Sequence, residues 1–196
     1  MIKNLLNIPT IYHLSQKVFL ADNFRKKLLK KILTNRNLDI LDIGCGPGNM
    51  INYLSFNKYY GFDTDKKYIK YAKNKYKNCI FFCERFTKLS LKKITKVDLV
   101  LLFGILHHIS DDEVLKLIDV LKLSLKKNSK IITLDPVYIK KQNRISKFLI
   151  DNDRGNFVRT TKDYLNLLKK TGITFSYKIY NQKIVPYTYI VTILKN

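Results

Sequence analysis

This sequence has no long apolar run, no recognisable export signal and few cysteines, and each of these features argues against one class of protein. No apolar run reaches the roughly 18 to 20 residues that cross a bilayer. Residues 1–9 contain one lysine and no small-residue cleavage site, so a secretory leader is not expected. With three cysteines in 196 residues and no export signal, the expected compartment is the reducing cytoplasm.

Acidic residues are also few, at 15 against 37 Lys and Arg, which gives a net charge of +22. Such an excess is typical of proteins that bind nucleic acid or anionic membranes. The chain is, however, rich in Lys, Asn and Ile with only six Arg, as AT-rich coding produces, and its lysines are scattered. A solvated basic surface is therefore the favoured interpretation. Acidic substrates and a weak association with an anionic membrane surface remain open, and nucleic acid is disfavoured.

The composition of the chain predicts one folded domain over residues 1–196. Hydrophobic residues make up 46% and aromatic residues 12%, too many for a disordered chain. Residues 1–37 carry apolar side chains at helical spacing and predict an N-terminal helical segment. Later patterns predict helices over 66–76, 113–125 and 162–170, and strands over 79–83, 97–103, 130–134, 173–180 and 187–194.

Residues 38–49, Leu-Asp-Ile-Leu-Asp-Ile-Gly-Cys-Gly-Pro-Gly-Asn, predict a buried strand that ends in a glycine-rich turn. The turn lacks the Gly-Lys-Ser/Thr ending of a P-loop and the full Gly-x-Gly-x-x-Gly spacing of dinucleotide binders. Glycines at 44, 46 and 48 let the backbone turn sharply and approach a ligand closely. Residues 49–56 then predict a helix whose first amides face that ligand.

This stretch closely resembles the first motif of class I S-adenosylmethionine-dependent methyltransferases. Residues 98–109, which end in Leu-His-His-Ile, resemble the fourth motif of their small-molecule branch, including quinone-biosynthesis enzymes. The resemblance covers roughly residues 30–195. It implies an α/β, three-layer Rossmann-like sandwich with a seven-stranded, mostly parallel sheet in the order 3-2-1-4-5-7-6 and strand 7 antiparallel. It also implies S-adenosyl-L-methionine as cofactor, S-adenosyl-L-homocysteine as product and no metal.

Asp63 is the strongest candidate for a ribose contact, because an ionised carboxylate offers two acceptor oxygens to two vicinal hydroxyls. The alternative role, capping the helix that follows, suits Asp65 or Thr64 better. In the family an acidic residue at the position of Glu84 accepts from the adenine amino group. The cofactor site that the resemblance implies comprises Asp42, Gly44, Cys45, Gly46, Asn49, Asp63, Thr64, Glu84, Arg85, Phe86, Phe103 and Gly104.

His107 and His108 are candidate general bases for a hydroxyl acceptor, because histidine titrates near working pH. For His108 the alternative role is structural, at the start of the helix that begins with Ser110-Asp111-Asp112-Glu113, which has the pattern of a capping box. The sequence leaves both roles open, with His107 preferred as the base.

Residues 137–160 do not belong to the minimal fold and predict a substrate lid. Arg154 and Arg159 in it predict an anion clamp, because arginine holds carboxylate or phosphate with a planar fork. An equally weighted alternative pairs both with Asp151 and Asp153. The predicted acceptor contacts are Tyr12, Gln16, Asp135, Arg154, Arg159 and Tyr187.

The predicted function is methyl transfer to a small molecule, with a hydroxyl favoured over nitrogen or carbon and an acidic or lipid-linked acceptor. Methylation of tRNA or rRNA is the alternative, motivated by charge. The chain lacks both the Asn/Asp-Pro-Pro-aromatic motif and the Pro-Cys nucleophile, so the corresponding types of base methylation are disfavoured. A third reading, a cofactor-binding module without catalysis, is the least favoured.

Overall fold

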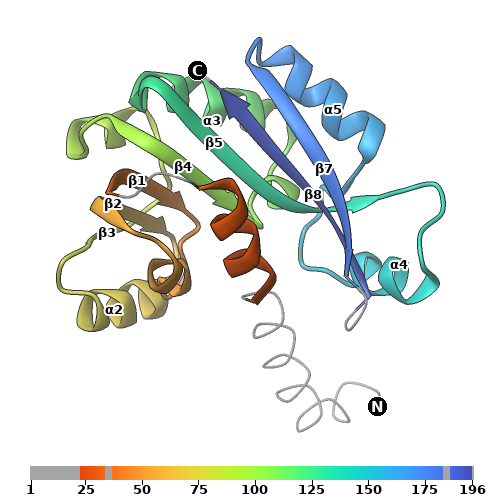
Figure 1. Cartoon of the computed structure of the whole chain (residues 1–196), viewed down its shortest axis with the longest axis horizontal. Coiled ribbons are helices and arrows are strands. Elements are labelled where there is room, and N and C mark those ends of the chain that lie inside the picture. The colour runs from red at the N-terminus through yellow and green to blue at the C-terminus, as the bar shows by residue number, and fades with distance from the viewer. Residues whose placement is uncertain (1–22, 34–36, 183–185, 196) are drawn as a thin grey trace, which may run out of the picture.

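The computed structural model describes residues 23–33, 37–182 and 186–195, and its strands form one sheet of eight (Figure 1). The order is β3-β2-β1-β4-β5-β8-β7, with β6 paired to β5 off this path. Of the described strands, β8 alone runs antiparallel to its neighbours β5 and β7. The strands are β1 (Leu38–Ile43), β2 (Phe56–Asp63), β3 (Ile80–Cys83), β4 (Val97–Phe103), β5 (Leu125–Tyr138), β6 (Arg159–Thr160), β7 (Thr174–Gln182) and β8 (Tyr187–Lys195).

The predicted strand order is confirmed, because β7 and β8 are the sixth and seventh strands of the expected sheet. The two-residue strand β6 is an addition that extends from the end of β5. Within the described ranges, no helix is both long enough and apolar enough to cross a bilayer.

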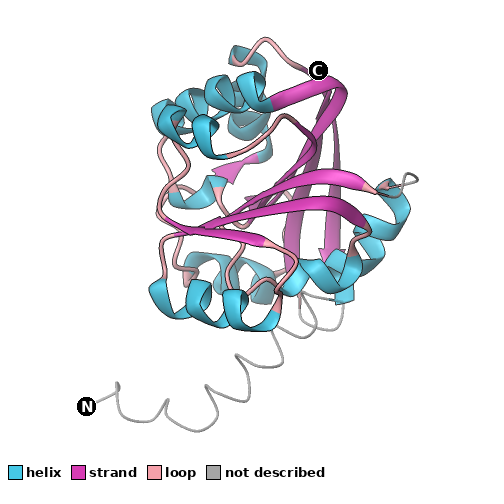
Figure 2. Ribbon diagram, turned by 90° about the vertical axis from the view of Figure 1, so that its left-hand side faces the viewer, coloured by secondary structure: helices cyan, strands magenta, loops and turns pink. Residues whose placement is uncertain are grey.

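Helices cover both faces of the sheet (Figure 2). Along β1 the side chains alternate between the two cores: Leu41 and Ile43 pack on one face and Ile40 on the other. Residues 23–32 and α2 cover the face of Ile40, while α3 and α5 cover the opposite face. The helices are α2 (Lys66–Lys75), α3 (Asp111–Ser124), α4 (Arg144–Asp151) and α5 (Thr161–Lys170), with 3-10 turns η1 (Asn49–Tyr53), η2 (Lys88–Lys93) and η3 (Leu106–His108).

Two predicted helix starts are confirmed by their hydrogen bonds. The Ser110 hydroxyl accepts from the Glu113 amide at 3.3 Å, and the Ser110 amide donates to the Glu113 carboxylate at 3.0 Å. Asp65 caps α2 by accepting from the amides of Lys67 and Tyr68. Asp65 therefore fills the capping role that was the alternative for Asp63.

Three predicted elements differ in the structure. The helix expected over 49–56 is the five-residue turn η1, because β2 already begins at Phe56 and pairs with β1 there. The strand expected over 130–134 runs from Leu125 to Tyr138, since both ends find partners in β4, β6 and β8. The insert 137–160 contains α4 and β6. Tyr12 and Gln16, and most of the helix expected over 1–37, lie outside the described residues.

Candidate active site

The glycine loop after β1 takes a backbone path that other residues rarely follow. Gly44, Gly46 and Gly48 have φ of 70°, 54° and 82°, in the left-handed region. The Gly44 amide donates to the Phe62 carbonyl at 2.7 Å, which fastens the loop to the end of β2. A Cβ at Gly44 would lie 2.0 Å from Ile105, in the segment after β4. The loop is thus held between the carboxyl ends of β2 and β4.

Asp63 is oriented by two backbone amides at the carboxyl end of β2. One carboxylate oxygen accepts from the Gly46 amide at 2.8 Å and the other from the Asp65 amide at 2.8 Å. An ionised carboxylate has about four lone-pair sites, so further acceptor sites remain on this half-buried group. The structure therefore brings the predicted ribose ligand directly onto the predicted glycine loop.

Asp42, a predicted cofactor contact, is only 2% exposed. Its carboxylate accepts from the Tyr59 hydroxyl. Burial raises the pKa of Asp42 to about 6, against the lowering effects of the Tyr59 hydrogen bond and the positive charge of Arg25. Arg25, from the helix over 23–32, was missed by sequence reasoning. Its signal was weak: it is one arginine in a lysine-rich helix.

The side chains expected to contact adenine, Glu84 and Phe86, already have partners within the chain. The Glu84 carboxylate accepts from the Ser90 hydroxyl at 3.1 Å and from the Lys93 ammonium at 2.5 Å, because η2 folds back toward it. The Phe86 side chain is 8% exposed and packs edge-on against Phe62 in the core. Like Asp63, the Glu84 carboxylate has one partner on each oxygen and keeps further acceptor sites, whereas the buried Phe86 ring is part of the core.

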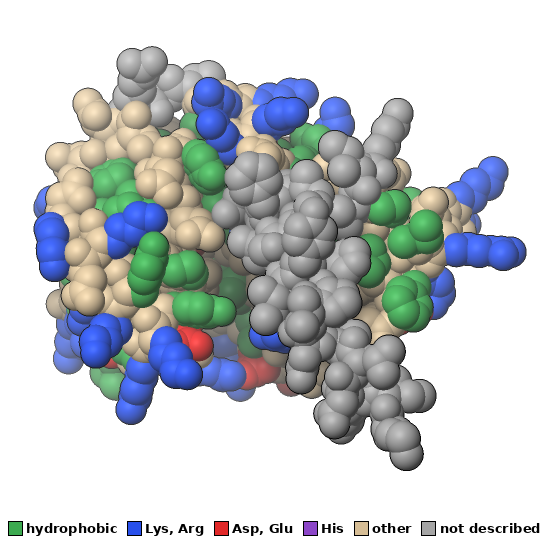
Figure 3. Space-filling view, turned by 90° about the horizontal axis from the view of Figure 1, so that it is seen from below, with side chains coloured by type: hydrophobic (Ala, Val, Ile, Leu, Met, Phe, Trp, Pro, Cys, Tyr) green, Lys and Arg blue, Asp and Glu red, His purple; other side chains and the backbone are tan. Residues whose placement is uncertain are grey.

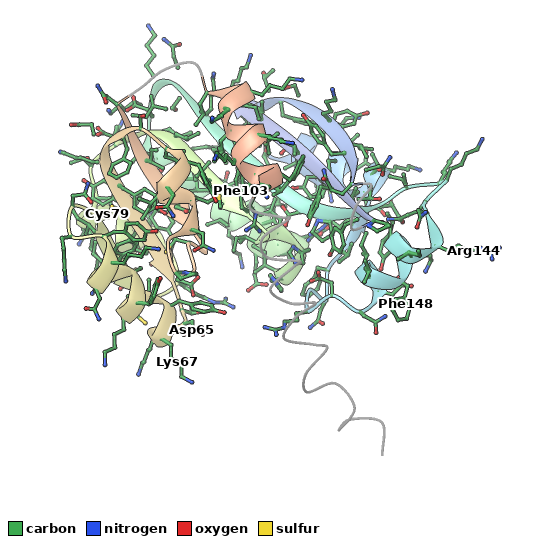
Figure 4. All side chains as sticks on the ribbon, turned by 60° about the horizontal axis from the view of Figure 1, so that its bottom comes forward. Asp65, Lys67, Cys79, Phe103, Arg144 and Phe148 are labelled. Atoms are coloured by element: carbon green, nitrogen blue, oxygen red, sulfur yellow. The ribbon has the colours of Figure 1, made fainter. Side chains whose placement is uncertain are left out.

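The other predicted cofactor residues surround the same strand ends. Gly104 has a φ of 74°, and its amide donates to the Leu134 carbonyl at 2.7 Å, which turns the chain sharply after β4. Figure 4 labels Phe103 at the end of β4 and Asp65 just after β2. Cys45 and Phe103 are buried, Asn49 is half-buried, Thr64 is exposed, and Arg85 is exposed in an ion pair with Glu113 at 3.2 Å.

His107 is held between two carboxylates and is 6% exposed. Its Nδ1 lies 2.8 Å from Asp135 and its Nε2 lies 3.3 Å from Asp153. Burial alone lowers the pKa of His107, but the hydrogen bonds and charges of Asp135 and Asp153 outweigh it and raise the pKa to about 9. His107 is therefore an imidazolium at neutral pH. In this arrangement it has no lone pair with which to act as a base, contrary to the sequence-based preference.

Further contacts pack the insert onto His107 and join it to β8. The Phe157 amide donates to the His107 carbonyl at 2.9 Å. The Tyr187 hydroxyl donates to Asp153 at 2.5 Å, so this predicted acceptor contact joins β8 to the insert. A Cβ at Gly155 would lie 2.0 Å from the His107 ring, so a glycine is required there. Sequence reasoning missed Gly155 and the role of Asp153, because no local sequence pattern indicates that they meet His107, which lies far away in the chain.

Asp135, another predicted acceptor contact, is wholly buried. One of its oxygens accepts from His107 and the other from the Tyr164 hydroxyl at 3.1 Å. It therefore acts on the site through His107.

His108 differs from its neighbour in both exposure and charge. It is exposed, with its ring centroid 4.1 Å from that of His107. Partial burial and the positive charge of His107 lower the pKa of His108 below its usual 6.5, so the ring is neutral at pH 7. Of the two histidines, His108 is thus the one that can accept a proton.

One group of described side chains has the composition of a metal site. Ligand atoms of His107, His108 and Asp153 lie within 4.8 Å of one another. The ion pair from His107 to Asp153 already explains why these two residues lie close together. Metal binding would require His107 to give up the proton that makes this pair.

Arg159 is neither a free anion clamp nor a partner of Asp151 or Asp153. It is 8% exposed, and its guanidinium donates to the carbonyls of Leu106 at 2.6 Å and Ile109 at 2.9 Å, and to Asp111 at 2.8 Å. These bonds hold the η3 turn that carries both histidines. The clamp prediction is wrong for Arg159 because its donors are already used.

The remaining residues of the predicted clamp separate. Asp151 pairs with Lys147 at 2.8 Å and accepts from the Tyr138 hydroxyl, so the alternative pairing with arginine is not formed either. Arg154 is exposed, next to Asp153 in the chain, and its charge acts on His108. Arg154 alone keeps the position expected of an anion contact.

Replacing His107 with glutamine is expected to remove a pH dependence of stability. A pKa of about 9 in the folded chain, against an ordinary 6.5, gives stability that is complete below pH 6.5 and lost as pH rises through 9. The wild-type free energy of unfolding should fall over this window by at most about 1.4 kcal/mol per pH unit. Urea unfolding at several pH values measures the slope.

The matched control for this change is His108→Gln, which should keep the wild-type slope because the pKa of His108 is not raised. A His107→Gln variant with the wild-type slope would contradict the buried imidazolium.

The position of these groups in the fold is that of a ligand site. β1 lies between β2 and β4, so the order of strands along the chain reverses beside β1. Open α/β sheets bind ligands outside the carboxyl ends of their strands at this switch point. The glycine loop, Asp63, Gly104 and the two histidines all follow those strand ends.

Comparisons with known proteins agree with this geometry. Residues 40–128 match the family model described as methyltransferase domain. Over 189 residues the chain is 28% identical to 235L of Invertebrate iridescent virus 6, a protein assigned as a methyltransferase, covering 84% of this chain and 65% of that protein. The chain thus spans slightly less than two thirds of this relative.

Solved structures share the fold at low sequence identity. A protein from Nostoc punctiforme PCC 73102 assigned as an O-methyltransferase superposes with a TM-score of 0.67 at 15% identity, over 90% of this chain and 56% of that one. Magnesium protoporphyrin IX methyltransferase from Synechocystis PCC 6803, solved with bound S-adenosylmethionine, gives 0.61 at 17% identity, over 90% and 79%. Residues 40–128 thus match a methyltransferase domain, and the chain has the Rossmann-like fold of these methyltransferases.

Proposed function

We propose that this chain transfers a methyl group from S-adenosylmethionine to a small-molecule acceptor. The observation that supports the proposal is the hydrogen bond from the Gly46 amide to Asp63, which joins the glycine loop to the carboxylate expected to bind the ribose, at the switch point. The loop would hold the amino-acid part of the cofactor, and the unused acceptor sites of Asp63 would take the ribose hydroxyls.

The cofactor supplies a methyl group already activated by a positive sulfur, so the protein has to align the acceptor and exclude water. The segment from Asp153 to Phe157, packed on His107, forms a rigid wall for this purpose. For a hydroxyl acceptor, His108 is the base, since it is exposed and neutral while His107 is charged and enclosed. His107 positions this turn through its two carboxylates.

The acceptor in this proposal is a hydroxylated small molecule with an acidic group or a lipid tail. Exposed Arg154 beside the wall supports the acidic group. The resemblance to quinone-biosynthesis enzymes rests on residues 98–109 alone. We propose a cytoplasmic location, which the small number of cysteines supports, and RNA remains the second candidate acceptor because of the charge of +22.

Calorimetric titration tests the proposal directly. S-adenosylhomocysteine should bind at one site per chain, and NAD should not bind, because the loop lacks the dinucleotide spacing. Tight binding of NAD without binding of S-adenosylhomocysteine would overturn the assignment. Competition by tRNA that falls steeply with added salt would favour the RNA alternative.

A further inference from the structure

The helix α4 presents two large apolar side chains to solvent. Ile145 is 57% exposed and Phe148 is 64% exposed, one helical turn apart. Figure 4 shows Phe148 and Arg144 at the outer edge of the molecule, both away from the sheet. Exposed apolar side chains that lie together and are rimmed by polar residues are typical of surfaces that bind a partner.

The opposite face of α4 is firmly attached to the sheet. Ser146 and Ile150 are each 2% exposed, and the Ser146 hydroxyl lies 3.0 Å from the Thr188 hydroxyl on β8. Asn143 caps the helix by accepting from the amides of the first turn. The outward direction of Ile145 and Phe148 is therefore fixed by the fold, and a partner would meet a preformed surface.

Positive charge surrounds these apolar side chains. The flanking cations are all exposed, and within α4 and the residues beside it one acid, Asp151, neutralises Lys147 at 2.8 Å. Asp153, just beyond, is turned toward His107 and Tyr187. In Figure 3 a hydrophobic patch lies on the side of the molecule that carries α4, flanked by Lys and Arg. The cations are Lys140, Lys141, Arg144, Lys147 and Arg154.

We propose that the outer face of α4 docks on an anionic membrane surface. Apolar side chains on an interfacial helix enter the boundary between headgroups and acyl chains, and Lys and Arg beside them attract anionic lipids. Ile145 and Phe148 with their flanking cations have this arrangement. A nucleic acid would account for the cations but not for the exposed isoleucine, Ile145.

Docking would also bring the bilayer close to the acceptor side of the site. Asp151 ends α4, and two residues later Asp153 reaches His107. If the proposed function holds, an amphiphilic acceptor could pass from the bilayer to His108 over a short path. The membrane contact itself does not depend on that activity.

Co-sedimentation with lipid vesicles tests the docking. The full chain should bind vesicles that contain phosphatidylglycerol and not vesicles of phosphatidylcholine alone. Lys141→Gln with Arg144→Gln should weaken that binding roughly 10- to 30-fold, at about one kcal/mol for each cation near an anionic surface. The double variant Ile145→Ser with Phe148→Ser should weaken it as well, at unchanged salt.

Matched controls lie elsewhere on the surface. Leu89→Ser removes an apolar side chain that is 72% exposed on η2, and Lys73→Gln removes a cation from α2; neither should change vesicle binding. The proposal would be overturned if the controls lost as much vesicle binding as the α4 variants, or if all variants bound vesicles equally. It would also be overturned if the wild-type chain bound no vesicles and the α4 variants instead lost binding to tRNA. Titration with S-adenosylhomocysteine, unaffected in every variant, keeps this test separate from that of the proposed function.

Discussion

Replacing Asp63 with alanine is expected to weaken the binding of S-adenosylhomocysteine by about 100-fold or more. Hydrogen bonds to a charged group contribute about 1.5–3 kcal/mol each, and the variant loses two toward the ribose hydroxyls. It also leaves the Gly46 amide without its acceptor, which loosens the glycine loop. Calorimetry at constant pH measures the change in Kd.

The conservative variant Asp63→Asn separates these two causes. Its side-chain oxygen can still accept from the Gly46 amide, while the negative charge and one acceptor oxygen are lost. We expect a loss of about 10-fold, smaller than for alanine.

Asp65→Asn is the matched control, because asparagine caps helices as well as aspartate does and Asp65 faces α2. Its Kd should equal that of the wild type. If Asp63→Ala binds S-adenosylhomocysteine as tightly as the wild type, Asp63 does not hold the ribose.

Replacing Arg159 with alanine is expected to destabilise the chain by about 2–5 kcal/mol, because two enclosed carbonyls each lose their donor. Those carbonyls, on Leu106 and Ile109, flank the turn that carries His107 and His108. Arg159→Lys should recover only part of the loss, since an ammonium cannot copy the planar fork. Urea unfolding monitored by circular dichroism measures the free energy of unfolding.

Arg154→Ala serves as the control, since Arg154 is exposed and makes no side-chain hydrogen bond within the described part of the chain, so its loss should change stability by less than about 0.5 kcal/mol. Wild-type stability in Arg159→Ala, together with a raised KM for an acidic acceptor, would restore the anion clamp and contradict the structural role.

Features encoded by neighbouring residues were predictable from the sequence. The glycines at 44, 46 and 48 all take positive φ, and the capping box of Ser110 and Glu113 forms as expected. The strand order was also predicted correctly, because the family resemblance implied it.

The environment of His107 was not predictable in the same way. Its partner Asp135 comes from the end of β5, and Asp153 comes from the insert, whose path no periodicity indicates. Two nearby carboxylates change a candidate base into a buried cation. In the proposed function the role of general base therefore passes to His108, which the sequence ranked second.

The partners of Arg159 and Glu84, which the sequence assigned to ligands, were not predictable either. Arg159 finds three acceptors on η3 and α3, and Glu84 finds Ser90 and Lys93 on η2. A long charged side chain can reach many partners, so its residue type alone does not determine which one it takes. Asp63, with a short side chain at a strand end, had far fewer choices.

The most direct measurement is a crystal structure of the chain with S-adenosylhomocysteine. The predicted result places both ribose hydroxyls within hydrogen-bond distance of Asp63 and the amino-acid part against the loop from Gly44 to Gly48. An empty crevice at saturating ligand, or a ligand bound away from Asp63, would contradict it.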